Sequence, residues 1–385
     1  MAAAAAGELV TVASFHVGEK RVRFVNKLKI LLHFLILKGE HGIPFLDIWA
    51  LSIHDAKYQN KTLCFQNNTG RLPWSAGGDV RRLLRLGALG VVWGLSSAAA
   101  WGWGKLAHRA SAFVAEAHLT PQARSAVRKI LVGESLADVS AWADSLRADR
   151  RFKHTVWYHF EKIEDSERYL DALQRMTPEE RGRGGAVAAI LVSMKILRDP
   201  YESDRAKEVA LKFLVHFIGD IHQPLHTGRP EDNGAVKIDV SWFGIPMSLH
   251  GVWDSGMIIT GHSDLFENTV EGADFGQIYA QYLLRELQRW KDPLGEAEDI
   301  EAWVSEAMRV RPEAYDPRYE KDQTAYQADN LSLVDRQVYA SGVRLAGVLN
   351  RIFARYPVSK VEQQLWNMVD RILNGIERVI NLHPR

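Results

Sequence analysis

The chain has 385 residues, a formal net charge of +1 and 46% hydrophobic residues, a composition typical of globular proteins. The balanced charge gives no global attraction to nucleic acid, so any such binding has to come from a local surface. The sequence has a single cysteine, Cys64, which excludes an intramolecular disulfide framework and a multi-thiolate metal site.

The first recognisable pattern is an apolar run at 83–100, which follows two arginines and ends in small residues. A basic start, an apolar core and small residues before a cleavage point are typical of an export signal. We therefore interpret 80–102 as a signal peptide, cleaved before Trp103 or, alternatively, before Trp101. The mature protein is then expected to be secreted or periplasmic, without stable membrane association. A membrane anchor is the alternative, because the run is barely long enough to span a bilayer.

Residues 1–79 precede this signal, although a signal peptide belongs at the start of a chain. The segment has an apolar patch at 30–37, and no methionine occurs between Met1 and Met176. One hypothesis is that translation starts at a non-standard codon at Val80 and that 1–79 is not native. A genuine extension of the chain is the alternative.

From residue 103 onward, apolar residues recur every three or four positions, which is the period of an amphipathic helix. Thr120 before Pro121 and Ser203 before Asp204 are typical helix starts. The predicted helices are 106–117, 122–132, 136–147, 186–198, 205–221, 274–290, 298–309, 333–354 and 360–380. The segment 227–248 predicts one long loop or a short hairpin. The expected fold class is therefore all-α, with one multi-helix domain over 103–385.

Histidines and aspartates recur through this domain at spacings suited to metal ligands. His216 and Asp220 are four residues apart, as are His250 and Asp254, and on a helix such a pair lies on one face. Nitrogen and oxygen ligands without sulfur suit zinc at a catalytic site. The other candidate ligands are the α-amine that cleavage would free at Trp103, and the side chains of His108, Asp144, His159 and His226.

Each of these features has a structural explanation when it is taken alone. A single His–Asp pair is usually a solvated helix pair, His216 lies in an apolar run that suits a core histidine, and Asp144 suits a helix surface. Their joint occurrence favours metal binding. His222 follows Asp220 too closely to point the same way, so we expect it to support the ligands rather than to be one.

These motifs resemble those of the zinc-dependent single-strand nucleases of the S1/P1 type. The family's Trp-Gly-x-x-Gly-His, Trp-Ala-Asp, Trp-His-Phe/Tyr, His-Phe-x-x-Asp-x-His-Gln-Pro-Leu-His and Leu-His-x-x-Trp-Asp motifs have counterparts, in order, over 103–254. The segment 340–350 resembles the family's last helices. The resemblance covers essentially the whole predicted mature chain, and it implies the all-α fold that this family shares with zinc phospholipase C.

The resemblance also implies three zinc ions per chain and a set of ligands for each. The first zinc would be held by Asp144, His159, His216 and Asp220, the second by His226, His250 and Asp254, and the third by the amine and carbonyl of Trp103 with His108 and a bridging Asp220.

The implied reaction is hydrolysis of single-stranded DNA or RNA to 5′-nucleotides, with removal of 3′-phosphates from nucleotides. Water between the first and third zinc would attack phosphorus, and the second zinc would stabilise the leaving 3′-oxygen. Single-stranded nucleic acid and 3′-nucleotides are then the substrates, and no protein partner is implied.

Two further residues are expected to act on the substrate. Arg147, one helical turn after Asp144, would clamp a phosphate oxygen and join Asp144 and Asp220 in catalysis. Phe160, beside His159, would stack a base, and stacking tolerates every base. The structural alternatives are a surface arginine and a core phenylalanine.

The chain departs from the family at a few positions. Ala107 replaces a glycine, Tyr158 is an additional residue before His159, and Ser248 and Ser255 replace asparagines of fungal members. One rival function is a zinc phospholipase C, which would have glutamate in place of the last aspartate and a shorter loop than 227–248. The other is a non-catalytic exported zinc-binding protein.

Overall fold

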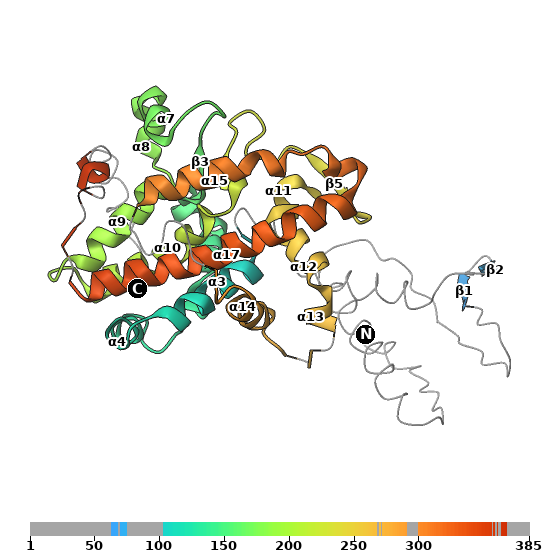
Figure 1. Cartoon of the computed structure of the whole chain (residues 1–385), viewed down its shortest axis with the longest axis horizontal. Helices are drawn as coiled ribbons and strands as arrows, with labels where there is room; N and C mark the ends of the chain where they lie inside the picture. Colours follow the sequence, from blue (N-terminus) through green and yellow to red (C-terminus); the bar gives the residue numbers. More distant parts are fainter. Residues whose placement is uncertain are drawn as a thin grey trace, which may run out of the picture. The chain divides into compact units, whose positions relative to one another are not determined.

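The computed structural model of the chain describes 103–367, except 268, 271, 291–298, 356, 359, 361 and 362, together with two short strands near the start of the chain. These strands, β1 (Leu63–Asn67) and β2 (Gly70–Trp74), pair antiparallel. The chain divides into two compact units, Met1–Ser97 and Ala98–Arg385 (Figure 1). The predicted signal peptide 80–102 and the rest of 1–79 lie outside the described residues.

The second unit is built from helices. Its longer helices are α3 (Lys105–His118), α4 (Pro121–Ile130), α9 (Ala186–Arg198), α10 (Asp204–Asp220), α14 (Phe275–Glu286), α15 (Ile300–Ala314) and α17 (Gln323–Phe353). The shorter α-helices are α5 (Leu136–Val139), α6 (Trp142–Ser145), α7 (Tyr169–Arg175), α8 (Pro178–Arg183), α11 (Leu249–Gly251), α12 (Met257–Gly261), α13 (Ser263–Glu267) and α16 (Arg318–Lys321).

Tighter and wider turns complete the helical part. The 3₁₀ segments are η2 (Leu146–Ala148), η3 (Arg150–His159) and η4 (Pro224–His226), and a π-helical turn, η5 (Val252–Gly256), follows α11. Two small sheets are present in the described part of this unit. Strands β3 (Glu161–Lys162) and β4 (Thr227–Gly228) pair in parallel, and β5 (Asp239–Trp242) and β6 (Ile245–Ser248) form an antiparallel hairpin.

The all-α expectation is confirmed, and so is the short hairpin within 227–248. The two predicted helix starts act as caps: the Thr120 and Ser203 side chains accept hydrogen bonds from the backbone N–H groups of Ala123 and Ala206. None of the helices in the described residues combines the length and apolar character needed to cross a bilayer.

The predicted continuous helix at 136–147 is wrong. The chain instead forms α5, α6 and η2, with a break at Ser140 and Ala141. The break leaves the Ser140 carbonyl outside any helix ladder, where it accepts a hydrogen bond from Nδ1 of His216 at 2.7 Å. The interruption therefore serves a neighbouring side chain, which periodicity does not reveal.

The ends of the unit also differ from expectation. Helix α17 begins ten residues before the predicted helix at 333–354, at a cap in which Asp322 accepts from the Ala325 backbone N–H. Of the predicted helix 360–380, the structure describes helix at 363–367, and residues beyond 367 lie outside the described part. Helices α7 and α8 were not predicted from the sequence.

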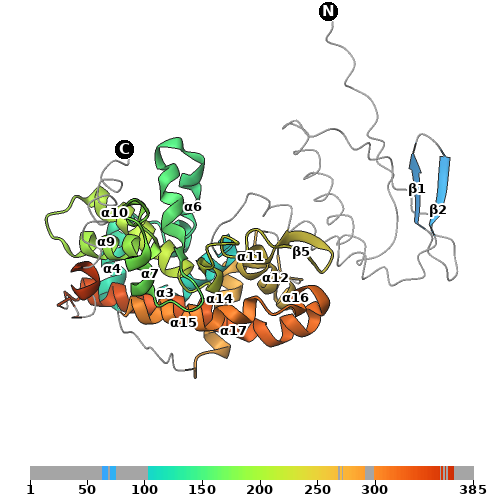
Figure 2. The ribbon, with the colours of Figure 1, turned by 90° about the horizontal axis from the view of Figure 1, so that it is seen from above.

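The core lies between the longer helices. Helix α9 is buried along nearly its whole length and packs against α10, whose last two turns are also buried. Helix α17 runs along one side of the unit (Figure 2) and packs against α3, α4, α10 and α12. Helices α3 and α10 also meet inside the unit, and their polar residues His108, His216 and Asp220 are buried there.

Candidate metal centre

The last turn of α10 carries two fully buried polar side chains on one face. Nε2 of His216 lies 3.3 Å from Oδ2 of Asp220, as the four-residue spacing on a helix predicts. Helix α3 brings His108 to the same place. Its ring stacks on that of His216 with centroids 4.0 Å apart, and its Nε2 lies 3.2 Å from Oδ1 of Asp220.

A first group of donor atoms forms where η3 and α6 meet this end of α10. Nδ1 of His159 lies 3.0 Å from both Oδ2 of Asp220 and Nε2 of His216. Oδ1 of Asp144 is 3.7 Å from Nε2 of His216 and 3.8 Å from Nδ1 of His159. Tetrahedral zinc, with ligands at about 2.0–2.1 Å, separates its ligand atoms by about 3.3 Å. The first group therefore has the spacing of a single-ion site.

A second group is formed by η4, α11 and η5. Nε2 of His250 lies 3.3 Å from Oδ2 of Asp254, and Nε2 of His226 lies 3.8 Å from Oδ1 of Asp254. The two imidazole rings face each other with centroids 4.9 Å apart. All three side chains are buried. His226, His250 and Asp254 thus converge as the sequence pattern suggested.

Backbone carbonyls orient three of the imidazoles. His216 donates from Nδ1 to the carbonyl oxygen of Ser140 at 2.7 Å. His226 donates in the same way to that of His159 at 2.5 Å, and His250 to that of Gly234 at 2.6 Å. A proton fixed on Nδ1 leaves the Nε2 lone pair directed into the cluster, which is the usual arrangement of metal-bound histidine.

Several of the converging atoms are buried and have no hydrogen-bond partner among the described residues. They are Nε2 of His108, His226 and His250, and one carboxylate oxygen each of Asp220 and Asp254. Buried polar atoms almost always have a partner. Imidazole nitrogens and carboxylate oxygens that face one another in this way fit a bound cation, and the absence of sulfur suits zinc.

The electrostatics of the cluster also favour a cation. Burial alone would raise the pKa of Asp220, but the facing imidazoles of His216 and His226 hold that pKa well below its usual range. Burial lowers the pKa of His159 to about 3. Burial also acts to lower the pKa of His216, but Asp220 and Asp144 outweigh it and raise that pKa to about 9. Positive charge is therefore stabilised where the carboxylates meet.

Trp103 and Gly104, the first described residues of the second unit, lie against the same cluster. Trp103 is buried, and the next residue donates its backbone N–H to the Asp254 carbonyl oxygen at 2.9 Å. A β-carbon built on Gly219 would lie 2.8 Å from Nδ1 of His108 and 3.8 Å from Cδ1 of Trp103. Trp103 and His108 thus flank the end of α10, close to Asp220.

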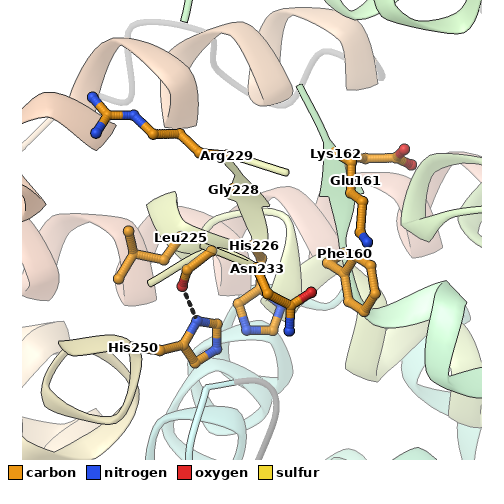
Figure 3. A pocket seen from close by; sticks show the side chains of 10 residues that line it. Phe160, Glu161, Lys162, Leu225, His226, Gly228, Arg229, Asn233 and His250 are labelled. Atoms are coloured by element: carbon orange, nitrogen blue, oxygen red, sulfur yellow. Dashed lines mark hydrogen bonds between the residues drawn. The ribbon is translucent and has the colours of Figure 1, made fainter. Parts of the chain in front are cut away.

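The two predicted substrate residues are both at the cluster. Nη2 of Arg147 pairs with Oδ1 of Asp144 at 2.8 Å, so the guanidinium contacts a candidate ligand. Phe160 is half-buried, packs edge to face on Trp157 with centroids 5.8 Å apart, and lines a pocket. The pocket is lined by Phe160, Glu161, Lys162, Leu225, His226, Gly228, Arg229, Asn233, Gly234 and His250 (Figure 3).

A left-handed turn shapes one wall of this pocket. Asn233, Gly234 and Ala235 have φ angles of 57°, 64° and 62°. A β-carbon at Gly234 would lie 2.3 Å from the carbonyl oxygen of Leu225, so glycine is required there. The turn directs the Gly234 carbonyl at Nδ1 of His250, at 2.6 Å. The Asn-Gly pair marks a turn in the sequence, but its role in orienting a ligand was not predicted.

Two residues between Asp220 and His226 support the cluster. His222 does not face the ligands: its Nδ1 donates to Ile218 O at 2.6 Å, and its Nε2 lies 2.9 Å from Nη1 of Arg344. Gln223, which sequence reasoning missed, is buried and donates from Nε2 to Oδ1 of Asp254 at 2.8 Å. Its position within the His-Gln-Pro-Leu-His motif was the available signal.

This fold and this cluster define a helical protein in which three His/Asp groups could hold metal ions. The chain belongs to the S1/P1 nuclease family, whose model, described as S1/P1 Nuclease, matches residues 103–354. Endonuclease 2 of Arabidopsis thaliana is 30% identical over 268 residues, which cover 66% of this chain and 91% of that protein.

Two fungal nucleases are also similar. Nuclease S1 of Aspergillus oryzae is 33% identical over 162 residues, covering 41% of this chain and 55% of that protein. Nuclease P1 of Penicillium citrinum is 34% identical over 170 residues, covering 42% and 61%. The chain is therefore a member of a family of hydrolases that act on phosphodiester bonds, and the expected family is confirmed.

Proposed function

We propose that this protein is an exported, zinc-dependent nuclease that hydrolyses single-stranded DNA or RNA to 5′-nucleotides and removes 3′-phosphates from nucleotides. The observation that carries the proposal is the convergence of buried imidazole nitrogens and carboxylate oxygens at 3.0–3.8 Å beside a pocket with an aromatic wall. Three zinc ions would use the nine ligand residues that the sequence predicts.

The first and third sites would share Asp220. Its Oδ2 faces His159 of the first group, and its Oδ1 faces His108 at the start of the unit, which is the placement that a bridging carboxylate needs. Trp103 lies beside His108, and the family match begins at Trp103. Both observations support a processed chain whose terminal amine completes the third site, and hence export.

When bound, the zinc ions would supply an acidified water molecule and positive charge for the phosphate and the leaving oxygen. The residues of the chain do the positioning. Arg147 holds Asp144 and brings a positive charge to the edge of the cluster, where a phosphate oxygen can accept from it. Phe160 offers a ring face for a base at the mouth of the second group.

A zinc-loaded protein that begins at Trp103 tests this function directly. We expect hydrolysis of single-stranded DNA, RNA and 3′-AMP, little hydrolysis of double-stranded DNA, and loss of activity with a chelator that added zinc restores. Hydrolysis of phosphatidylcholine instead of nucleic acid would favour the phospholipase alternative. Zinc binding without turnover on any of these substrates would favour a non-catalytic zinc protein.

Metal analysis separates the sites. His226→Ala and His250→Ala should each lower the zinc content by about one equivalent per chain, and the double variant should lose no more. Loss of all zinc in either single variant would contradict the assignment of these two residues to one separate site.

A further inference from the structure

Lys162 lines the same pocket as His226 and His250 of the second group. It lies on β3, opposite Gly228 of β4, and Ile163 N donates to Gly228 O at 3.2 Å. The buried guanidinium of Arg311 donates to the carbonyl oxygens of Ile163 and Thr227 and so ties the two strands together. Because β4 directly follows His226, the position of Lys162 is fixed relative to the metal cluster.

The Lys162 ammonium lies against two aromatic rings. Nζ is 5.1 Å from the centroid of Trp157 and 5.6 Å from that of Phe160. Figure 3 shows the amine directed toward the Phe160 ring, across the pocket from His226 and His250. Among the residues that the structure describes, no carboxylate forms an ion pair with this ammonium. The charge is therefore available to a bound anion.

Two more cations gather at the same place from other segments. Arg183 of α8 lies over the Trp157 ring, with Cζ 5.2 Å from the ring centroid. Lys237, in the loop before β5, donates to the Glu231 carbonyl at 2.8 Å. Burial, then the positive charges of Lys237 and Arg183, lower the pKa of Lys162, and the Glu180 carboxylate opposes them with a smaller effect. Arg183 itself pairs with Glu179 at 2.6 Å.

Interleaved cations and ring faces suit a single nucleic-acid strand. The cations attract successive phosphates, and the rings stack bases without regard to sequence. A mononucleotide that occupies the metal cluster and the Phe160 ring has no second phosphate for a neighbouring cation. A strand has one at each nucleotide.

We infer that Trp157, Phe160, Lys162, Arg183 and Lys237 form a strand-binding track, in which Lys162 contacts a phosphate adjacent to the one being hydrolysed. This inference rests on the proposed nuclease function and extends it: the track makes a polynucleotide chain a better substrate than a 3′-nucleotide. Lys162 acts on binding of the chain and takes no part in the hydrolysis of a mononucleotide.

Lys162→Met tests this inference, because methionine keeps the unbranched stem against the rings and removes the charge. In the zinc-loaded protein that begins at Trp103, kcat/KM for a ten-nucleotide single strand should fall about fivefold at 50 mM salt, the scale of one surface phosphate contact. The log–log salt dependence should flatten by about 0.7. Hydrolysis of 3′-AMP should stay within about twofold of the unsubstituted protein.

Lys129→Met is the matched control. Lys129 is exposed on α4, a helix that contributes no residue to the pocket. The substitution removes the same charge, and it should leave both substrates and the salt slope unchanged. Thermal unfolding of both variants checks that the fold is retained.

A binding measurement separates failure of the track from failure of the nuclease function. With a chelator present, fluorescence anisotropy of a labelled strand should give a Kd about fivefold higher for Lys162→Met, whether or not the protein is a nuclease. Equal losses on the strand and on 3′-AMP would overturn the inference, since Lys162 would then act on the reacting nucleotide. Unchanged strand binding, or a loss that depends on the base, would overturn it as well.

Discussion

Gly219→Ala is a small change that should disturb the metal cluster without unfolding the protein. Gly219 directly precedes Asp220 in α10, and its Cα faces the ring of His108. An added β-carbon would lie 2.8 Å from Nδ1 and 3.0 Å from Cε1 of His108. Normal contact between such atoms is about 3.5 Å, so the ring must shift by roughly 0.6 Å. That ring also stacks on His216, and its Nε2 faces Asp220.

The expected change in the free energy of unfolding is modest. Overpacking in a filled site costs about 1–3 kcal/mol, and replacing a helical glycine by alanine recovers up to about 1 kcal/mol. The net destabilisation should therefore be about 0–3 kcal/mol. A displaced ligand has a larger effect on function, because disturbing the contacts that orient a metal ligand costs about 10–100-fold in metal affinity or activity.

The assay combines zinc content, urea unfolding and the rate on single-stranded DNA. Gly219→Ala should lose about one zinc and most of its rate while unfolding close to the unsubstituted protein. Gly182→Ala, on α8, is the control, because a β-carbon there meets no atom within 4 Å, and it should keep its zinc and its rate. A Gly219→Ala protein with full zinc and full rate would show that His108 is not a ligand in this geometry.

Three other outcomes can be measured on the same material. Asp220→Asn should lower the rate on single-stranded DNA by at least about 10³-fold, because the Asp220 carboxylate faces both His108 and His159. Half of the original rate with full zinc content would rule out the bridging role. A protein that begins at Trp103 should be faster and hold its third zinc more tightly than one that begins at Gly102, because an amide nitrogen cannot donate a lone pair as a free amine does; equal rates would remove the terminal amine from the ligand set. Burial raises the pKa of Glu161 to about 7, from a usual value of 4.5, so the folded protein keeps a proton that the unfolded chain releases between these pH values. The free energy of unfolding should therefore fall by about 3 kcal/mol from pH 5 to pH 8; Glu161→Gln should abolish this decline in urea titrations at the two pH values, and an undiminished decline would point to other groups.

Periodicity predicted most of the long helices because each of these buries one face in the core, whereas α9 is buried on nearly all sides. It failed at 136–147, where the chain breaks at Ser140 so that a carbonyl can reach His216. The apolar side chains there keep the helical spacing, and the interruption is dictated by a residue 76 positions away. A tertiary hydrogen bond of this kind leaves no trace in the local pattern.

The spacing of histidine and aspartate predicted which residues of the candidate site would meet, because the last turn of α10 and the α11–η5 turn each present one His–Asp pair. Their orientation could not be predicted in the same way. The carbonyl that orients His250 comes from a left-handed turn at Gly234, and Lys162 reaches the pocket through a strand pair of two residues. Both depend on segments that are distant in sequence.

The stretch from His216 to His226 is dense in polar residues because the end of α10 lies next to both candidate metal groups. His216 and Asp220 face the first group from the last turn of α10. His222, just past that turn, contacts Arg344 of α17, and the same Nη1 donates to Glu306 of α15 at 2.6 Å, so the end of α10 is anchored to two other helices.

The remaining residues of this stretch carry the chain from one group to the other. Gln223 uses its amide twice, donating to Oδ1 of Asp254 and accepting from the Leu225 backbone N–H at 2.5 Å. The first contact orients a ligand of the second group, and the second starts the 3₁₀ turn that presents His226 to the same group. Replacing His222 or Gln223 should therefore weaken metal binding, although neither residue is a proposed ligand. A replacement on the exposed face of α10 should not, because that face contacts neither group.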